Sequence, residues 1–172
     1  MKKTCCFLGH RKINIEAHMV ERIYLIIEDL IVNYNVNIFL FGSKSQFNDL
    51  CYQITSKLML KYSDIKRIYV RAEFPYIDYE YKAYLLERYE ETYYPDRIIK
   101  AGKSAYIERN YEMIDKSDFC IVYFDEEYKA PIRKSCNSFL PERQSKSGTA
   151  IAYNYALKKH KNIINVYTDG EV

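Results

Sequence analysis

With 172 residues, of which 48% are hydrophobic and 28% charged, the chain has the length and composition of one globular domain and is not extensively disordered. Its net charge of +3 is too small to indicate nucleic-acid binding, and no stretch approaches the ~20 apolar residues of a membrane-spanning helix. We therefore expect a single cytoplasmic domain over residues 1–172 that has no membrane partner and no nucleic-acid partner.

Apolar runs rich in β-compatible residues predict the strands of this domain. They lie at residues 3–8, 37–41, 65–71, 97–100, 119–124 and 162–167. Between these runs, apolar residues that recur every three to four positions predict amphipathic helices. The helices lie at residues 14–33, 47–58, 78–91, 104–114 and 150–159. Asn14 and Ser104 are the expected N-cap residues of two of them.

Residues 128–147 show no convincing periodicity, and loops of this length inside a compact domain are usually functional or mobile. The segment is strongly basic, because a single acid, Glu142, stands against several cations. These cations are Lys129, Arg133, Lys134, Arg143 and Lys146.

The five cysteines are odd in number and show no Cys-x-x-Cys spacing, so we expect neither a metal site nor a cofactor. Cys136 alone lies in a polar loop, where Arg133 and Lys134 would favour its thiolate form. It is a candidate nucleophile, although no histidine is near it in the sequence.

Alternating strands and helices, with strands that are apolar throughout, predict an α/β fold: a doubly wound, mainly parallel sheet with helices on both faces. In such sheets the carboxyl ends of the strands share one edge, and ligands bind there at the point where the strand order reverses. Polar and glycine residues at the carboxyl ends of the predicted strands, together with the turn that opens the helix at residues 150–159, are therefore candidate ligand-binding residues. They are Gly9, His10, Arg11, Gly42, Ser43, Arg71, Asp125, Ser147, Gly148 and Thr149.

Several of these residues also have an ordinary structural interpretation. The Ser147-Gly148-Thr149 turn offers hydroxyl groups, backbone N–H groups and a helix N-terminus to a phosphate or carboxylate, but it could equally be a simple helix cap. Arg11 could bind a phosphate or pair with a surface acid. Tyr123 and Tyr128 could stack on a base, although packing is the commoner role of a tyrosine.

Three segments resemble a known family. They are residues 6–11 (Cys-Phe-Leu-Gly-His-Arg), residues 108–118 with Glu-Arg-Asn-Tyr at their start, and residues 147–156, which begin Ser-Gly-Thr. In this order, over residues 4–166, they resemble the SLOG superfamily, with the greatest likeness to its uncharacterised YpsA-like branch. The resemblance implies a Rossmann-like fold that binds nucleotides or nucleotide-derived ligands, and it adds Arg109 and Asn110 to the candidate site.

Relatives in this superfamily include the DNA-processing protein DprA and the LOG phosphoribohydrolases, whose Pro-Gly-Gly-x-Gly-Thr-x-x-Glu signature carries a catalytic glutamate. Alignment of Gly148 and Thr149 with that signature places Ala152 at the glutamate position. An alanine cannot stabilise an oxocarbenium ion or activate water. Catalytic residues are thus unknown, and Asp125 and Glu126 are the candidates if the protein is an enzyme.

Two functions remain open on the sequence. The first is binding of a nucleotide-like phosphorylated small molecule, by a sensor or sequestering protein. The alternative is hydrolysis or transfer at a nucleotide N-glycosidic bond with a non-standard catalytic acid. A homodimer is a further expectation, with the tyrosine-rich residues 78–94 as its surface.

Overall fold

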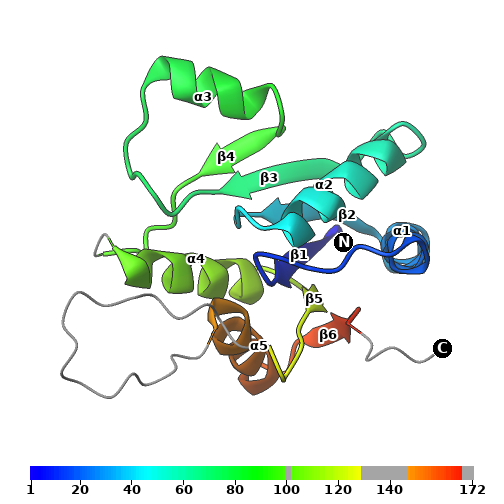
Figure 1. Cartoon of the computed structure of the whole chain (residues 1–172). Coiled ribbons are helices and arrows are strands. Elements are labelled where there is room, and N and C mark those ends of the chain that lie inside the picture. Colours follow the sequence, from blue (N-terminus) through cyan, green and yellow to red (C-terminus); the bar gives the residue numbers. More distant parts are fainter. Residues whose placement is uncertain (100–101, 129–146, 168–172) are drawn as a thin grey trace.

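A computed structural model describes residues 1–99, 102–128 and 147–167, which form a parallel six-stranded sheet between two layers of helices (Figure 1). The strands are β1 (Lys3–Gly9), β2 (Val36–Phe41), β3 (Lys66–Val70), β4 (Glu91–Tyr93), β5 (Phe119–Tyr123) and β6 (Asn162–Asn165). The helices are α1 (Ala17–Tyr34), α2 (Gln46–Met59), α3 (Tyr79–Leu86), α4 (Lys103–Asp115) and α5 (Gly148–Lys158). The predicted doubly wound α/β fold is confirmed.

The strand order is β4-β3-β2-β1-β5-β6, so the chain builds one half of the sheet outward from β1 and then returns to build the other half. Successive side chains of a strand point to opposite faces, and β1 shows this clearly. Phe7 packs with the residues of α1 and α2, whereas Cys6 and Leu8 pack with those of α4 and α5. Both faces of β1 are therefore buried, as its continuous apolar run requires.

The edge strand β4 lies at Glu91–Tyr93, and the predicted strand at residues 97–100 is wrong for the residues described. Residues 97–99 are a turn and irregular chain, and Lys100 lies outside the described residues. In β4, Thr92 is the register partner of Tyr69 in β3 and donates its hydroxyl to the carbonyl oxygen of Tyr69 at 2.9 Å. Pairing with β3, rather than an apolar pattern, defines this strand.

The two helices for which an N-cap residue was predicted have a different residue at that position. Asn14 does not cap α1, because its amide donates to the Glu16 carboxylate at 2.8 Å and Glu16 occupies the N-cap position without a side-chain cap. Ser104 lies inside α4, whose N-cap is Gly102 with a φ of 108°. That backbone conformation is open to glycine and costly for other residues, so the glycine sets the start of the helix. Helix α3 is also shorter than predicted.

No helix in the described part of the chain combines the length and the apolar character that crossing a membrane requires.

Candidate functional site

The strand order reverses between β1 and β5, and the residues that follow these two strands meet there. The Asp125 backbone N–H donates to Nε2 of His10 at 3.1 Å. The chain after β1 leads to α1 on one face of the sheet, and the chain after β5 leads to α5 on the other. Because loops diverge at such a point, it is where open α/β sheets bind ligands. The structure places His10 and Asp125 together at this point.

His10 is almost completely buried, with 1% of its surface exposed. The ring of Tyr128 stacks on it at a centroid distance of 3.8 Å and an interplanar angle of 21°, and Tyr123 and Phe124 lie farther away at 6.1 Å. Burial lowers the pKa of His10, so the neutral imidazole is favoured.

The hydrogen bond to Asp125 fixes the tautomer of this neutral ring. Since Nε2 of His10 accepts, the proton resides on Nδ1. Nδ1 is buried and has no hydrogen-bond partner among the described residues. A buried donor without a partner is costly, and such groups frequently mark functional positions. His10 therefore holds a buried N–H group that lacks an acceptor within the described part of the chain, which makes it a candidate donor to a ligand.

The end of β2 is built around Arg109 of α4. Its Nη1 donates to the carbonyl oxygens of Gly42 and Val70, and its Nε donates to the Asn110 side-chain oxygen at 2.9 Å. A Cβ atom at position 42 would lie 2.7 Å from Cδ of Arg109. Gly42 is thus required for the close approach of the guanidinium group, and Asn110 serves to orient that group.

Arg109 is 3% exposed, and no carboxylate of the described residues lies within ion-pair distance of it. Burial lowers its pKa, while the more distant Tyr69 and Glu73 act against this effect. Glu73 itself is paired with Lys44 at 3.7 Å. The guanidinium is a buried cation with neutral hydrogen-bond partners, and an anion placed beside it would be strongly attracted.

Ser147 caps the N-terminus of α5, which is the structural role proposed above as the alternative to anion binding. The Ser147 hydroxyl accepts the Ala150 backbone N–H at 3.1 Å. Thr149 is buried and Gly148 is exposed. The serine hydroxyl is therefore already used by the helix, which leaves the backbone of the first turn as the part of this motif that can face an anion.

Asn48 of α2 joins the ends of β1 and β2, and Gln46 of the same helix binds the chain that follows β1. Sequence reasoning missed both. The Asn48 side chain donates to the Phe7 carbonyl oxygen at 3.4 Å and accepts the Gly42 N–H at 3.5 Å. The Gln46 side chain accepts the Ile13 N–H at 2.9 Å. The available signal was Ser45, whose hydroxyl caps α2 three residues before Asn48.

Other predicted residues have different surroundings. Gly9 is required for packing, since a Cβ there would lie 2.3 Å from Cδ1 of Phe47. Arg71 donates to the Phe74 and Pro75 carbonyl oxygens at 2.9 and 3.4 Å. The rest contact neither His10 nor Arg109 through a hydrogen bond or an ion pair: Arg11 and Glu126 are exposed, and Ser43 is half-buried.

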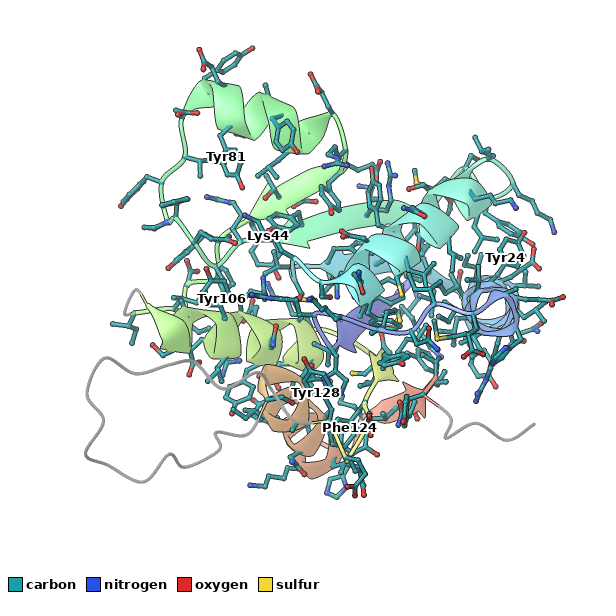
Figure 2. All side chains as sticks on the ribbon, in the orientation of Figure 1. Tyr24, Lys44, Tyr81, Tyr106, Phe124 and Tyr128 are labelled. Atoms are coloured by element: carbon teal, nitrogen blue, oxygen red, sulfur yellow. The ribbon has the colours of Figure 1, made fainter. Side chains whose placement is uncertain are left out.

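Figure 2 separates the two parts of this edge: Phe124 and Tyr128 lie over α5, whereas Lys44 and Tyr106 lie toward α4. The ring of Phe124 stacks on Tyr153 of α5 at 4.5 Å, and the guanidinium of Arg109 lies 5.9 Å from the ring of Tyr106. Cys136 and the basic residues of 129–146 lie outside the described residues.

Comparison with known proteins gives a likeness of structure without a likeness of sequence. No family model matches the sequence, and no curated protein matches it. Three solved chains match the structure, among them DNA processing protein A (DprA) from Helicobacter pylori, described for its unique single-stranded DNA binding mode. The match has a TM-score of 0.59 at 12% identity and covers 98% of this chain and 67% of that one. The chain thus shares the Rossmann-like fold of DprA, while its likeness to the SLOG superfamily and the YpsA-like branch stays a prediction.

Proposed function

We propose that the protein binds a nucleotide or another phosphorylated, nucleotide-derived small molecule at the carboxyl-terminal edge of its sheet. The observation that carries the proposal is His10, whose buried Nδ1–H has no partner among the described residues at the point where the strand order reverses. A phosphate or ribose oxygen is an acceptor of the kind that this donor lacks.

Arg109 supports an anionic ligand. A cation that is 3% exposed and has only neutral hydrogen-bond partners loses hydration without gaining an ion pair. A phosphate near the ends of β2 and β3 would supply the missing negative charge. The α5 N-terminus would add its backbone N–H groups and its dipole.

The aromatic rings suit the rest of such a ligand. Tyr128 already stacks on His10, and Tyr106 lies beside Arg109. Bases stack on tyrosine faces, and this contact contributes about 1–3 kcal/mol per base in nucleic-acid complexes. A ligand that combines a phosphate with a planar base therefore fits the site better than inorganic phosphate does.

Binding is favoured over hydrolysis of an N-glycosidic bond. Ala152, which aligns with the LOG glutamate, is fully buried in the apolar cluster beneath α4 and α5. The Asp125 carboxylate, the candidate replacement, accepts the Glu127 N–H at 2.8 Å. Turnover remains an alternative that the experiment below separates from binding.

The proposal is tested by calorimetric titration of the protein with AMP, ADP, ATP and inorganic phosphate. We expect at least one nucleotide to bind, and His10→Gln to weaken it at least about tenfold, because a hydrogen bond to a charged group contributes about 1.5–3 kcal/mol. His18→Gln is the matched control, since His18 is an exposed residue of α1 and should leave binding unchanged.

Three outcomes would contradict the proposal. The first is that no nucleotide binds. The second is that His10→Gln binds as well as the unmodified protein while its unfolding midpoint is unchanged. The third is sustained release of free base from a nucleotide, lost in Asp125→Ala, which would favour the N-glycosidase. A single-stranded oligonucleotide belongs in the same titration because of the DprA likeness, and salt-sensitive binding of it in preference to nucleotides would favour DNA.

A further inference from the structure

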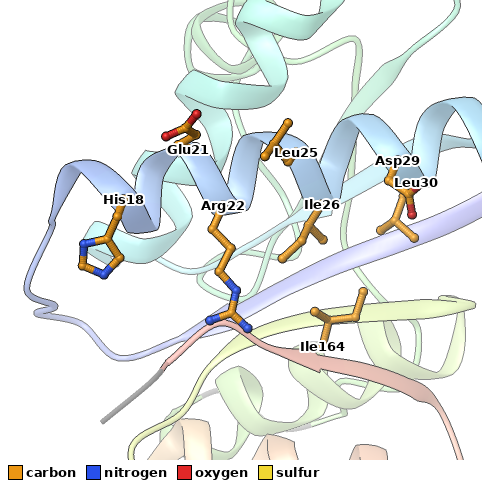
Figure 3. A pocket seen from close by; sticks show the side chains of 8 residues that line it. All are labelled: His18, Glu21, Arg22, Leu25, Ile26, Asp29, Leu30 and Ile164. Atoms are coloured by element: carbon orange, nitrogen blue, oxygen red, sulfur yellow. The ribbon is translucent and has the colours of Figure 1, made fainter. Parts of the chain in front are cut away.

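A hollow of about 550 Å³ lies between α1 and β6 (Figure 3). Its apolar lining includes Leu25, Ile26 and Ile164, and its charged lining includes Arg22 and Asp29. In Figure 3 the Arg22 side chain extends from α1 toward β6, and Ile164 lies below Ile26. Among the described residues β6 is the last strand of the sheet, so none of them forms a further strand on this side.

The residues of α1 beside this hollow form a second stripe along the helix. Met19, Ile23, Ile27 and Leu30 face the core and are buried. A separate set recurs at the same helical spacing and stays outside: His18, Arg22, Leu25, Asp29 and Val32. Leu25 and Val32 are 56% and 58% exposed. Large aliphatic side chains repeated on one exposed helix face are typical of a contact surface.

Two copies of this outer stripe have complementary charges when they are placed antiparallel to one another. Because an α-helix has about 3.6 residues per turn, Arg22 and Asp29 lie on one face, two turns apart. In an antiparallel pair of α1 helices related by a two-fold axis midway between Leu25 and Ile26, each Arg22 lies opposite Asp29 of the other copy. The same axis places Leu25 against Ile26 of the other copy, so charge and apolar contacts are satisfied together.

The two charged groups are available for such a contact. Arg22 has no hydrogen-bond or ion-pair partner among the described residues. Within the described part of the chain, Asp29 accepts a hydrogen bond from Asn33 on its own helix, at 2.6 Å, and from no other residue. We propose that this face of α1, with Ile164 of β6, is a two-fold interface that binds a second copy of the chain.

The tyrosine-rich residues 78–94, expected from the sequence to form a dimer surface, suit self-association less well. They carry five acids, Asp78, Glu80, Glu87, Glu90 and Glu91, against two bases, Lys82 and Arg88. A two-fold contact through this segment would bring acidic groups together, and like charges that face one another are destabilising. Self-complementarity favours α1.

Sedimentation equilibrium of the full chain tests the proposal between about 1 and 100 µM, where an interface of micromolar affinity is populated. We expect a dimer that Leu25→Glu converts to a monomer. Arg22→Asp should raise the dissociation constant at least about fivefold, and the double variant Arg22→Asp/Asp29→Arg should restore it to within about threefold of the original, as expected of a direct charge pair. Leu157→Glu, which changes an equally exposed leucine on α5, is the matched control and should stay dimeric.

A chain that is monomeric throughout this range would overturn the proposal. So would a dimer that survives Leu25→Glu, or a double charge reversal that is no better than the single one. Circular dichroism of each variant separates lost association from lost folding, because Leu25 and Arg22 are exposed and their replacement leaves the core intact.

Discussion

At the ends of β1 and β5 the carboxyl-terminal edge is closed by residues that directly follow the strands, whereas at the ends of β2 and β3 it is closed by an arginine from α4. In the first region His10 accepts the N–H of Asp125 and stacks on Tyr128. In the second, Arg109 binds carbonyl oxygens of Gly42 and Val70. Both regions thus use one buried side chain to hold two strand ends together.

The two side chains differ in charge, and this difference indicates what each can add to a ligand site. His10 is favoured as a neutral ring with one N–H that finds no acceptor in the described residues. Arg109 is a cation whose hydrogen bonds are made to neutral oxygens. We infer that the first region selects by a directed hydrogen bond and the second by electrostatic attraction, and the following substitutions test this division.

Replacement of Gly9 by alanine should have the largest effect on stability. The new Cβ would lie 2.3 Å from Cδ1 of Phe47, a ring that is fully buried in the core. We expect a loss of about 3 kcal/mol in the free energy of unfolding, since overpacking of a filled core costs about 1–3 kcal/mol. Gly42→Ala should cost roughly half as much, because it displaces the longer and more flexible side chain of Arg109.

Urea unfolding of the two variants measures this difference between the regions. Gly148→Ala is the matched control, because a Cβ there meets nothing within 4 Å. It should be neutral or stabilise the protein by up to about 1 kcal/mol, as glycine is a poor residue inside a helix. If Gly42→Ala lost as much free energy of unfolding as Gly9→Ala, the Arg109 side chain could not move to make room for the new Cβ atom.

A comparison of His10→Asn with His10→Gln tests how much the hydrogen bond accepted by Nε2 of His10 contributes to stability. Glutamine places an acceptor near the position of Nε2 and can keep the bond to the Asp125 N–H. Asparagine is too short, and an unpartnered buried N–H costs about 1–3 kcal/mol. We therefore expect His10→Asn to lose about 2 kcal/mol in the free energy of unfolding and His10→Gln less than half of that. Equal losses would mean that ring packing, and not the hydrogen bond, is what His10 contributes.

Arg109→Met should change stability by less than about 1 kcal/mol, because the lost hydrogen bonds are offset by release from the cost of burying a charge. Nucleotide binding should nevertheless fall at least about tenfold, since the cation that attracts the anion is gone. Chemical unfolding measures the change in stability, and calorimetric titration of the same preparation measures the change in nucleotide affinity. Arg97→Met is the control: Arg97 pairs with Glu108 and Asp115 on the surface, and its loss should leave binding intact.

A loss of several kcal/mol in Arg109→Met would contradict this assignment. It would identify Arg109 as a structural residue that ties β2 and β3 to α4, and the electrostatic part of the proposed site would fall with it. Unchanged stability of Arg97→Met, whose arginine precedes α4 and pairs with Glu108 and Asp115 of that helix, would show that the loss of an arginine beside α4 is not itself the cause.

The sequence predicted the layers and the meeting of His10 with Asp125, because apolar runs define parallel strands and parallel strands end at one edge. It did not predict why glycine is needed at positions 9 and 42. Gly9 makes room for Phe47 and Gly42 for Arg109, and both partners come from helices that only the folded chain brings close. Strand β4 was misplaced for a similar reason, since its pairing with β3 has no apolar signal of its own.

The smallest expected effect is on the pH dependence of the free energy of unfolding. This measurement tests whether the His10 ring is neutral in the folded protein. Burial lowers the pKa of His10 in the folded protein below the value of about 6.5 in an unfolded chain. As the pH falls, the unfolded state therefore takes up the proton first, and stability is lost. The contribution of His10 is complete above about pH 7 and decreases as the pH falls through 6.5 toward the lower folded pKa.

His10→Gln has no titrating group at this position, so its free energy of unfolding should decrease less between about pH 7 and pH 5 than that of the unmodified protein. His18 and His160 are exposed and present in both proteins, so the comparison isolates position 10. Parallel curves would mean that the imidazole gains its proton equally well in both states. In that case the ring would reach solvent or a negative charge, and the neutral donor on which the proposed nucleotide site depends would not exist.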